Sequence, residues 1–165
     1  MSPSDPRGPA PAGVSAALAT VMATIGFFAL AVFGLGALSI ATDAEIISVA
    51  GVGQAPGIIG MIIAVAVFAG ILWLALRIAQ PRFRSVWAIS IATTLAHLLA
   101  VGVGLLFAGG DFVTALAVMG GLVTGGASLV MLVVAAIAAW AGVALRRTRA
   151  KRPRWPWERE DSDEA

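Results

Sequence analysis

A run of apolar residues over positions 85–108 constrains the fold more than any other feature of this sequence. If it is helical, the run can cross the hydrocarbon core of a bilayer, because about 20 residues rising about 1.5 Å each are enough. Three further apolar runs occupy about 14–40, 57–79 and 112–145. Hydrophobic residues make up 59% of the chain and charged residues only 12%, whereas a soluble domain carries about 25% charged residues. The sequence therefore predicts an all-α integral membrane protein, a four-helix bundle.

The segments that flank these runs divide the chain into three regions. Residues 1–13 hold four prolines and no apolar run, so they predict a disordered N-terminal tail. Residues 14–145 form the predicted transmembrane domain. Within it, Pro56 suits the first turn of the second helix and Asp111 suits the N-cap of the fourth. Residues 146–165 form a charged C-terminal tail.

The apolar run over 112–145 is too long for a single straight span. As one helix it would measure about 50 Å, whereas the hydrocarbon core is about 30 Å thick. Glycines at positions 120, 121, 125 and 126 lie in the first half of the run. We therefore expect a kink at these glycines, or a helix that begins outside the bilayer and spans it from about Leu122 to Leu145.

The first apolar run, over 14–40, has to be distinguished from a cleaved leader. A secretory signal peptide has an apolar region of about 7–15 residues, which is shorter than this run. The run therefore predicts a membrane helix. The small residues Ser39 and Ala41 resemble a signal-peptide cleavage site, so cleavage near them is the alternative.

The distribution of charge predicts an orientation. With four spans, all 11 Lys and Arg residues lie on the side of both termini, and the loops of the other side carry only Asp43, Glu45 and Asp111. Cytoplasmic segments of membrane proteins are rich in Lys and Arg, so both termini are predicted to be cytoplasmic in a multi-pass protein of the cell membrane. Three tryptophans lie near arginines of this side, where indole rings favour the membrane interface. The predicted interface anchors are Trp73, Trp87, Trp140, Arg77, Arg82, Arg84, Arg146 and Arg147.

His97 lies near the middle of the run over 85–108, and Thr93 lies one helical turn before it. Ionisable residues inside a bilayer are costly and often functional, so the pair is a candidate buried polar site, for a proton relay or a single metal ligand. The alternative is a neutral imidazole that forms a hydrogen bond across a helix interface. We favour this structural role, because no second His, Cys, Asp or Glu occurs within a predicted span to complete a relay or a metal site. No metal and no cofactor is predicted.

Small residues recur at every fourth position of the run over 85–108. Small side chains let helix backbones approach closely, which favours helix association in lipid. Similar spacing occurs in Gly60-x-x-x-Ala64 and Ala66-x-x-x-Gly70. These rows predict either packing within the bundle or association with another membrane protein or a further copy of the chain. The predicted packing residues are Ala88, Ala92, Ala96, Ala100, Gly104, Ala108, Gly121 and Gly125.

The C-terminal tail begins with a basic cluster, from Arg146 to Arg159, and ends in acidic residues. Such a cluster can bind anionic lipid, with about 1 kcal/mol for each basic residue near the membrane surface. The preference for positive charge in the cytoplasm also accounts for the cluster, and we favour this simpler explanation. Nucleic acid is not a predicted partner, because the acidic end would repel it.

Sequence motifs do not indicate an enzyme. Nucleotide-binding loops, zinc-protease motifs and serine-hydrolase elbows do not occur, and every acidic residue lies outside the apolar runs, so His97 cannot complete a catalytic triad. We therefore predict a non-enzymatic accessory or scaffold subunit. The alternative is a small oligomeric transporter or channel with His97 at the membrane midplane, and a holin-like pore former is a weaker one. Small four-helix multidrug exporters are similar in helix count, but they carry a buried Glu in the first span that this chain lacks.

In size, span count and composition, the chain resembles the uncharacterised small four-span membrane proteins of actinobacteria. Its basic residues are almost all Arg, and Ala, Gly and Val are abundant, as is typical of proteins from GC-rich bacterial genomes. The resemblance covers the full length and implies a bacterial plasma membrane. It carries no functional residue over to this chain.

Overall fold

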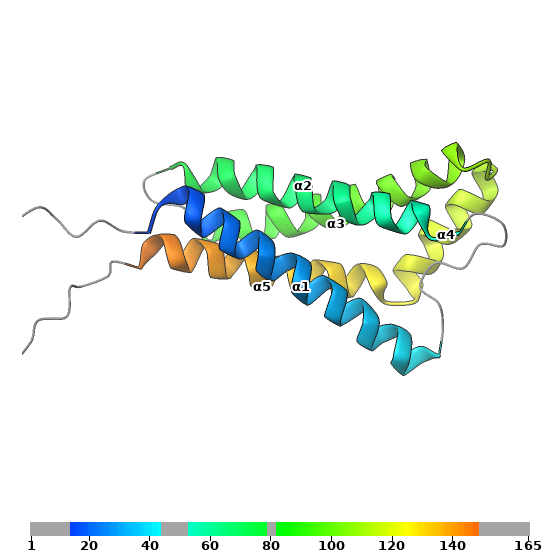
Figure 1. Cartoon of the computed structure of the whole chain (residues 1–165), viewed down its shortest axis with the longest axis horizontal. Coiled ribbons are helices and arrows are strands. Elements are labelled where there is room, and N and C mark those ends of the chain that lie inside the picture. Colours follow the sequence, from blue (N-terminus) through cyan, green and yellow to red (C-terminus); the bar gives the residue numbers. More distant parts are fainter. Residues whose placement is uncertain (1–13, 44–52, 79–81, 149–165) are drawn as a thin grey trace, which may run out of the picture.

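The computed structural model describes residues 14–43, 53–78 and 82–148, and within these ranges it contains α-helices and no strand. The predicted N-terminal tail and all but the first three residues of the predicted C-terminal tail lie outside the described residues. The helices are α1 (Ala16–Thr42), α2 (Ala55–Leu76), α3 (Arg84–Phe107), α4 (Phe112–Thr124) and α5 (Ala127–Arg147), as Figure 1 shows.

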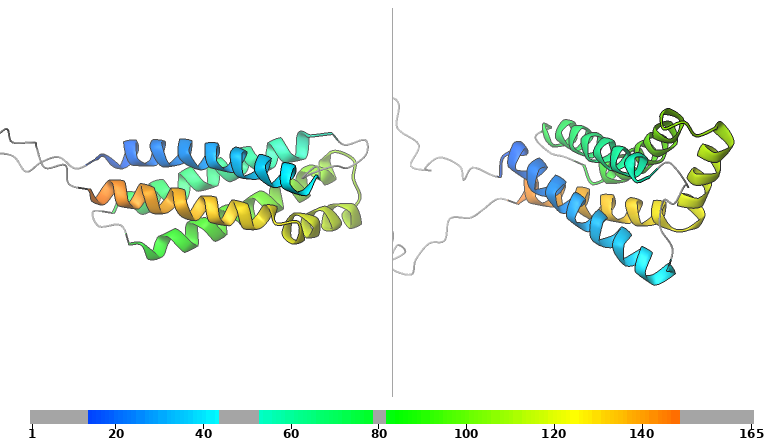
Figure 2. Two further views of the ribbon diagram at one scale, coloured as in Figure 1. Left: turned by 90° about the horizontal axis from the view of Figure 1, so that it is seen from below. Right: turned by 45° about the vertical axis from the view of Figure 1, so that its right-hand side comes forward.

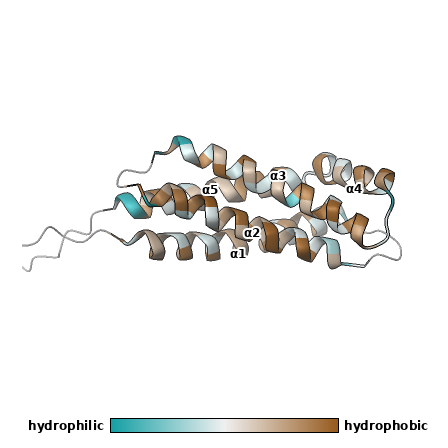
Figure 3. Ribbon diagram, turned by 90° about the horizontal axis from the view of Figure 1, so that it is seen from above, coloured by the Kyte–Doolittle hydropathy of each residue, from teal (hydrophilic) through white to brown (hydrophobic). Residues whose placement is uncertain are grey.

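Four of these helices, α1, α2, α3 and α5, are long and apolar enough to cross a membrane. Figure 3 shows hydrophobic residues along the length of the helices, with hydrophilic residues mainly near their ends. The all-α fold with four potential membrane spans, which the apolar runs predict, is confirmed.

The fourth apolar run, over 112–145, is divided into two helices, and the division falls at the glycines where a kink was expected. The helix is interrupted at Gly125 and Gly126, and Gly126 has a φ of 86°. Glycine adopts a positive φ without the steric penalty that a Cβ atom would cause. Helix α4 has 13 residues and is about 20 Å long, so it is too short to span. The potential span begins at Ala127, five residues later than expected.

Local sequence signals account for where three of the helices begin. The Ser15 hydroxyl accepts a hydrogen bond from the Leu18 amide at 3.1 Å and caps α1. Pro56 lies in the first turn of α2, where a missing amide hydrogen has no consequence. The Asp111 carboxylate accepts a hydrogen bond from the Thr114 amide at 2.9 Å and caps α4.

The long helices form two pairs. Helix α2 packs along α3, helix α1 packs along α5, and α5 also contacts α3. Helix α4 lies at one end of the molecule and connects the two pairs (Figures 1 and 2). At that same end, α1 diverges from α2, as the right-hand view of Figure 2 shows.

Two hydrophobic clusters hold these helices together. In the larger cluster, the Phe27 ring of α1 stacks on the Phe68 ring of α2, with ring centroids 4.5 Å apart. The smaller cluster joins Val101 and Leu105 of α3 to Leu122 of α4. Helix α4 is therefore an integral part of the bundle although it is too short to cross a membrane.

Each end of the bundle has its own charge. The start of α1, the end of α2, the start of α3 and the end of α5 lie together at one end (Figure 1). We call it the basic end, because five described arginines lie there: Arg77, Arg82, Arg84, Arg146 and Arg147. The opposite end carries the two acidic residues of the described ranges, Asp43 and Asp111.

Candidate functional site

The structure places His97 in the interface between α2 and α3, with 4% of its surface exposed. Gly60 of α2 makes room for the imidazole. A Cβ atom at Gly60 would lie 3.5 Å from His97 Nε2 and 2.5 Å from a methyl group of Val101. The absence of a side chain at Gly60 thus lets α2 approach α3 where the histidine is buried.

Thr93, one turn before His97, is fully buried, and its hydroxyl has no hydrogen-bond partner among the described residues. Its neighbours differ in this respect. The Ser90 hydroxyl donates to the Val86 carbonyl at 2.8 Å, and the Thr94 hydroxyl donates to the Ser90 carbonyl at 2.9 Å. An unpaired buried hydroxyl is uncommon, because it forgoes the hydrogen bonds it made with water.

His97 and Thr93 therefore form a small polar pair inside a potential span. Within the described ranges, no group of three or more His, Cys, Asp or Glu residues could hold a metal ion. A structural zinc site needs four ligands and a catalytic one needs three. The pair alone supplies one good ligand, and its chemistry is limited to hydrogen bonding and proton exchange at the imidazole.

The row of small residues on α3 does not face one neighbour over its whole length. Ala100 and Gly104 are buried, and a Cβ atom at Gly104 would lie 3.3 Å from the Pro56 Cα atom of α2. At the two ends of the row, Ala88 and Ala108 are exposed and do not pack within the described bundle. The reason is geometric, since every fourth position advances by about 40° around a helix of 3.6 residues per turn. Ala92 and Ala96 are half-buried, as this rotation requires.

The pair Gly121 and Gly125 terminates a helix instead of packing on one. Both residues are exposed, and the Gly125 amide donates to the Gly121 carbonyl at 2.7 Å where α4 ends. One close contact that the sequence did not predict is at Gly142 of α5, where a Cβ atom would lie 3.0 Å from Ala23 of α1 and 3.3 Å from Leu72 of α2. The sequence contains a signal for this contact, because small residues recur along α5 at spacings of three and four. These residues, all buried, are Ala135, Ala138, Ala139 and Gly142.

The three predicted interface tryptophans, Trp73, Trp87 and Trp140, are exposed on the outer surface of α2, α3 and α5. Of the predicted arginine anchors, Arg77, Arg82, Arg84 and Arg147 are exposed and Arg146 is half-buried. All eight side chains lie within or next to the parts of α2, α3 and α5 that lead to the basic end.

Arg146 connects three helices at the basic end. Its Nη1 group donates to the Val14 carbonyl, just before α1, at 3.0 Å. Its Nε group donates to the Leu76 carbonyl, in the last turn of α2, at 3.4 Å. The final carbonyls of a helix lack partners within the helix, so the guanidinium satisfies one of them and joins α5 to both neighbours.

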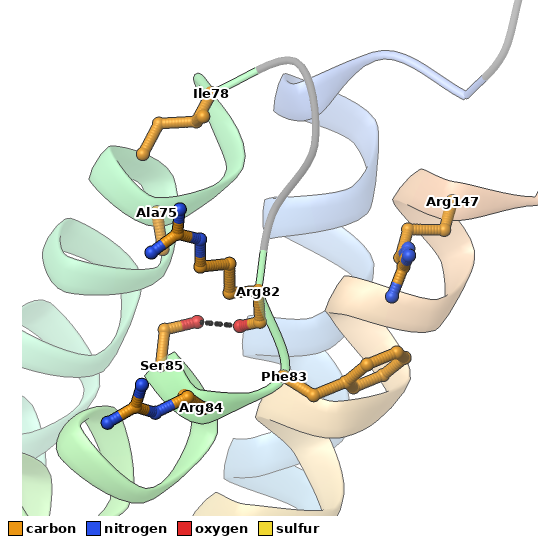
Figure 4. Close-up of a pocket in the computed structure, with 7 residues that line it drawn as sticks. All are labelled: Ala75, Ile78, Arg82, Phe83, Arg84, Ser85 and Arg147. Atoms are coloured by element: carbon orange, nitrogen blue, oxygen red, sulfur yellow. Dashed lines mark hydrogen bonds between the residues drawn. The ribbon is translucent and has the colours of Figure 1, made fainter.

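A pocket of about 860 Å³ lies at the basic end, lined by Arg147 and by residues of α2 and of the start of α3. The Arg147 guanidinium lies 5.0 Å from the centre of the Phe83 ring, and the Ser85 hydroxyl donates to the Arg82 carbonyl at 2.6 Å. Sequence reasoning missed this pocket, because its lining residues come from α2, from the start of α3 and from the end of α5, which only the folded chain brings together. Figure 4 shows its lining residues, which are Ala75, Ile78, Arg82, Phe83, Arg84, Ser85 and Arg147.

The chain also matches a known protein family of unknown function, DUF6121, over residues 13–165. It belongs to the DUF6121 family. The match includes all five helices, the polar pair on α3 and the basic end. No curated protein and no solved structure matches the chain. DUF6121 membership agrees with the expected resemblance to uncharacterised proteins and assigns no biochemical role, while an actinobacterial origin stays a prediction.

Proposed function

We propose that this DUF6121 protein is a multi-pass membrane protein that acts as a non-enzymatic accessory or scaffold subunit. In this role its transmembrane helices associate with another membrane protein or with further copies of the chain. Membrane insertion is supported by the large apolar side chains on the outside of the bundle, such as Phe33, which is 75% exposed, and Ile62, which is 63% exposed. Soluble proteins rarely expose continuous apolar surfaces of this kind.

The same proposal places both termini in the cytoplasm of a bacterial cell. The support is that all five described arginines lie at the basic end, whereas the described charges at the opposite end are Asp43 and Asp111. Lys and Arg concentrate on the cytoplasmic side of membrane proteins. An even number of spans brings both ends of the chain to that side.

The observation that carries the scaffold role is the incomplete packing of α1. All buried residues of α1 lie between Ala19 and Ala31, and none lies in the half from 32 to 42. In that half, Gly34 lies against α5 at Val130, but Phe33 and Gly36 are exposed and α2 diverges from it (Figure 2). An apolar helix that combines small residues with free faces suits close packing against another transmembrane helix.

Site-directed crosslinking in native membranes tests this role. Because the chain contains no cysteine, an introduced cysteine is its single reactive thiol. We expect a cysteine at Gly36 to form a crosslinked product of one defined mass. The matched control is Ile91→Cys, because Ile91 is an exposed apolar residue on the well-packed helix α3. Equal and random crosslinking from both positions, together with a monomer in mild detergent, would contradict the scaffold role.

A small transporter or channel is the second candidate function, and the unpaired Thr93 hydroxyl one turn from His97 favours it. A transport pathway needs polar groups inside the spans, and this pair is the candidate. The scaffold role predicts that purified protein in liposomes carries no flux and that His97→Ala only weakens packing. A pH-dependent flux that the His97→Ala variant loses would establish transport instead.

A further inference from the structure

We propose that the pocket at the basic end binds the phosphate group of an anionic phospholipid. The proposal relies on the membrane insertion proposed above, and it assigns a ligand to a site distinct from the α1 surface. The pocket lies where the apolar helices end, at the level where the headgroups of one leaflet would lie. Basic pockets between transmembrane helices on the cytoplasmic side are suited to anionic headgroups.

Three arginines from different parts of the chain line this pocket. Arg82 and Arg84 come from the link before α3 and from its first residue, and Arg147 comes from the end of α5. In Figure 4, Arg82 and Arg84 extend on either side of Ser85 toward α2, whereas Arg147 lies on the α5 side, beyond Phe83. A ligand in the pocket therefore lies between cationic groups from two directions.

The guanidinium groups of these arginines have free donors. Arg146 uses its side chain on the Val14 and Leu76 carbonyls. By contrast, within the described ranges none of Arg82, Arg84 and Arg147 donates a side-chain hydrogen bond or forms an ion pair, and the Arg147 guanidinium lies over the Phe83 ring. Each guanidinium carries five N–H donors in a planar fork, which matches two oxygens of a phosphate.

The start of α3 adds a second reason for an anion. Phe83 supplies no side-chain cap, and the first turn contains no acidic residue. A helix N-terminus carries about half a positive charge, so Arg84 lies in an electrostatically unfavourable place. A phosphate in the pocket would offset both the helix dipole and the mutual repulsion of the arginines.

The surroundings of the pocket favour a lipid over a soluble phosphate. Ile78 lines the pocket and is 63% exposed, and Phe83 is partly exposed beside it. One turn further along α3, Trp87 is 64% exposed on the outer surface of the bundle. Acyl chains can lie along these apolar side chains while the headgroup contacts the arginines. A free phosphate ion would bind the arginines but leave the apolar side chains exposed to water.

The test is a titration of the purified full-length protein in neutral detergent with phosphatidylglycerol. We expect the lipid to be retained in native mass spectrometry and to raise the thermal midpoint, and we expect neither effect from phosphatidylcholine or inorganic phosphate. The R82Q/R84Q variant should bind phosphatidylglycerol about 30-fold more weakly, since one arginine near an anionic lipid changes affinity about fivefold. The matched control is R152Q/R154Q, which removes the same charge from the C-terminal tail and should bind almost as the unchanged protein does.

Three results would overturn the proposal. Equal binding by both double variants would mean that the arginines form only a diffuse basic surface. Equal stabilisation by inorganic phosphate would mean that the pocket takes a soluble anion. Binding that requires deletion of the mainly acidic segment 158–165 would mean that the chain's own tail fills the pocket.

Two further measurements separate loss of lipid binding from misfolding and from failure of the scaffold role. If R82Q/R84Q does not fold, as judged by helical circular dichroism, Arg147→Gln replaces it, with an expected loss of about fivefold in affinity. Unchanged affinity in this variant would refute the proposal. Crosslinking at Gly36 reports separately on the scaffold role, because that residue lies in the half of α1 far from the basic end.

Discussion

At the scale of single residues, a buried glycine decides how closely two helices approach. Gly60 and Gly70 both lie on α2, but their surroundings differ. A Cβ atom at Gly60 would meet Val101 at 2.5 Å and the His97 ring at 3.4 Å, whereas nothing lies within 4 Å at Gly70. Sequence alone does not separate these glycines, because both are members of small-residue pairs at the same spacing.

We predict that Gly60→Leu destabilises the protein by about 1–3 kcal/mol, the usual cost of overpacking a filled core. The side chain would displace Val101 and His97 and separate α2 from α3. Gly70→Leu is the control on the same helix, and it should leave stability unchanged or slightly raised, because leucine favours helix more than glycine does. The thermal midpoint in detergent measures both, and equal effects of the two substitutions would contradict the packing described here.

At the scale of helices, a few polar side chains hold the ends of apolar elements in place. Arg146 joins α5 to the start of α1 and to the last turn of α2. Asp111 starts α4 through the backbone and hydroxyl groups of Thr114. These contacts fix the positions of helix termini, because the apolar residues inside the helices carry no polar groups that could do so.

Arg146→Gln should lower the free energy of unfolding by about 2 kcal/mol, because it removes two hydrogen bonds from a charged donor to backbone carbonyls. Arg147→Gln is the matched comparison on the same helix turn and should cost less than about 1 kcal/mol, the value of an exposed cation–π contact. Chemical unfolding in mixed micelles measures the difference. A larger effect at Arg147 would show that the bonds of Arg146 do not stabilise the bundle.

The stability of α4 should depend on pH through Asp111. The hydrogen bond from the Thr114 amide, followed by that from its hydroxyl, lowers the pKa of the Asp111 carboxyl below its ordinary value of 3.8. Because the folded-state pKa is the lower one, the stabilisation is fully present above about pH 4 and is lost as the pH falls through the folded pKa. Hydrogen exchange of residues 112–124 should therefore accelerate in acid relative to Asp111→Asn, which caps but does not titrate. An identical pH dependence in the variant would exclude this role.

At the scale of the whole molecule, the separation of charge defines two ends. An impermeant maleimide applied to intact cells should label Gln54→Cys, near the end with Asp43 and Asp111. It should label Ile78→Cys, near the basic end, only after the cells are permeabilised. Both positions are exposed, so access to the reagent depends on the side of the membrane. Labelling of both from one side would refute the proposed orientation.

The sequence alone determined the class of the molecule and much of its outline. Apolar runs of about 20 residues or more and few charged residues predicted the all-α fold and the four potential spans, because each such run is a property of consecutive residues. The break near Gly125 and the start of α4 at Asp111 also depend on local backbone chemistry, although the span begins at Ala127 and not near Leu122. Local signals of this kind need no knowledge of neighbouring helices.

Only the tertiary structure decided which faces of the helices meet. It brought His97 against Gly60, selected Gly142 over Gly121 for a close helix contact, and left Ala88 and Ala108 exposed. It also assembled Arg82, Arg84 and Arg147 around one pocket while engaging Arg146 with backbone carbonyls. The physical reason is that an almost uniformly apolar helix gives no preferred inward face, so the choice depends on how side chains from distant parts of the chain fit together.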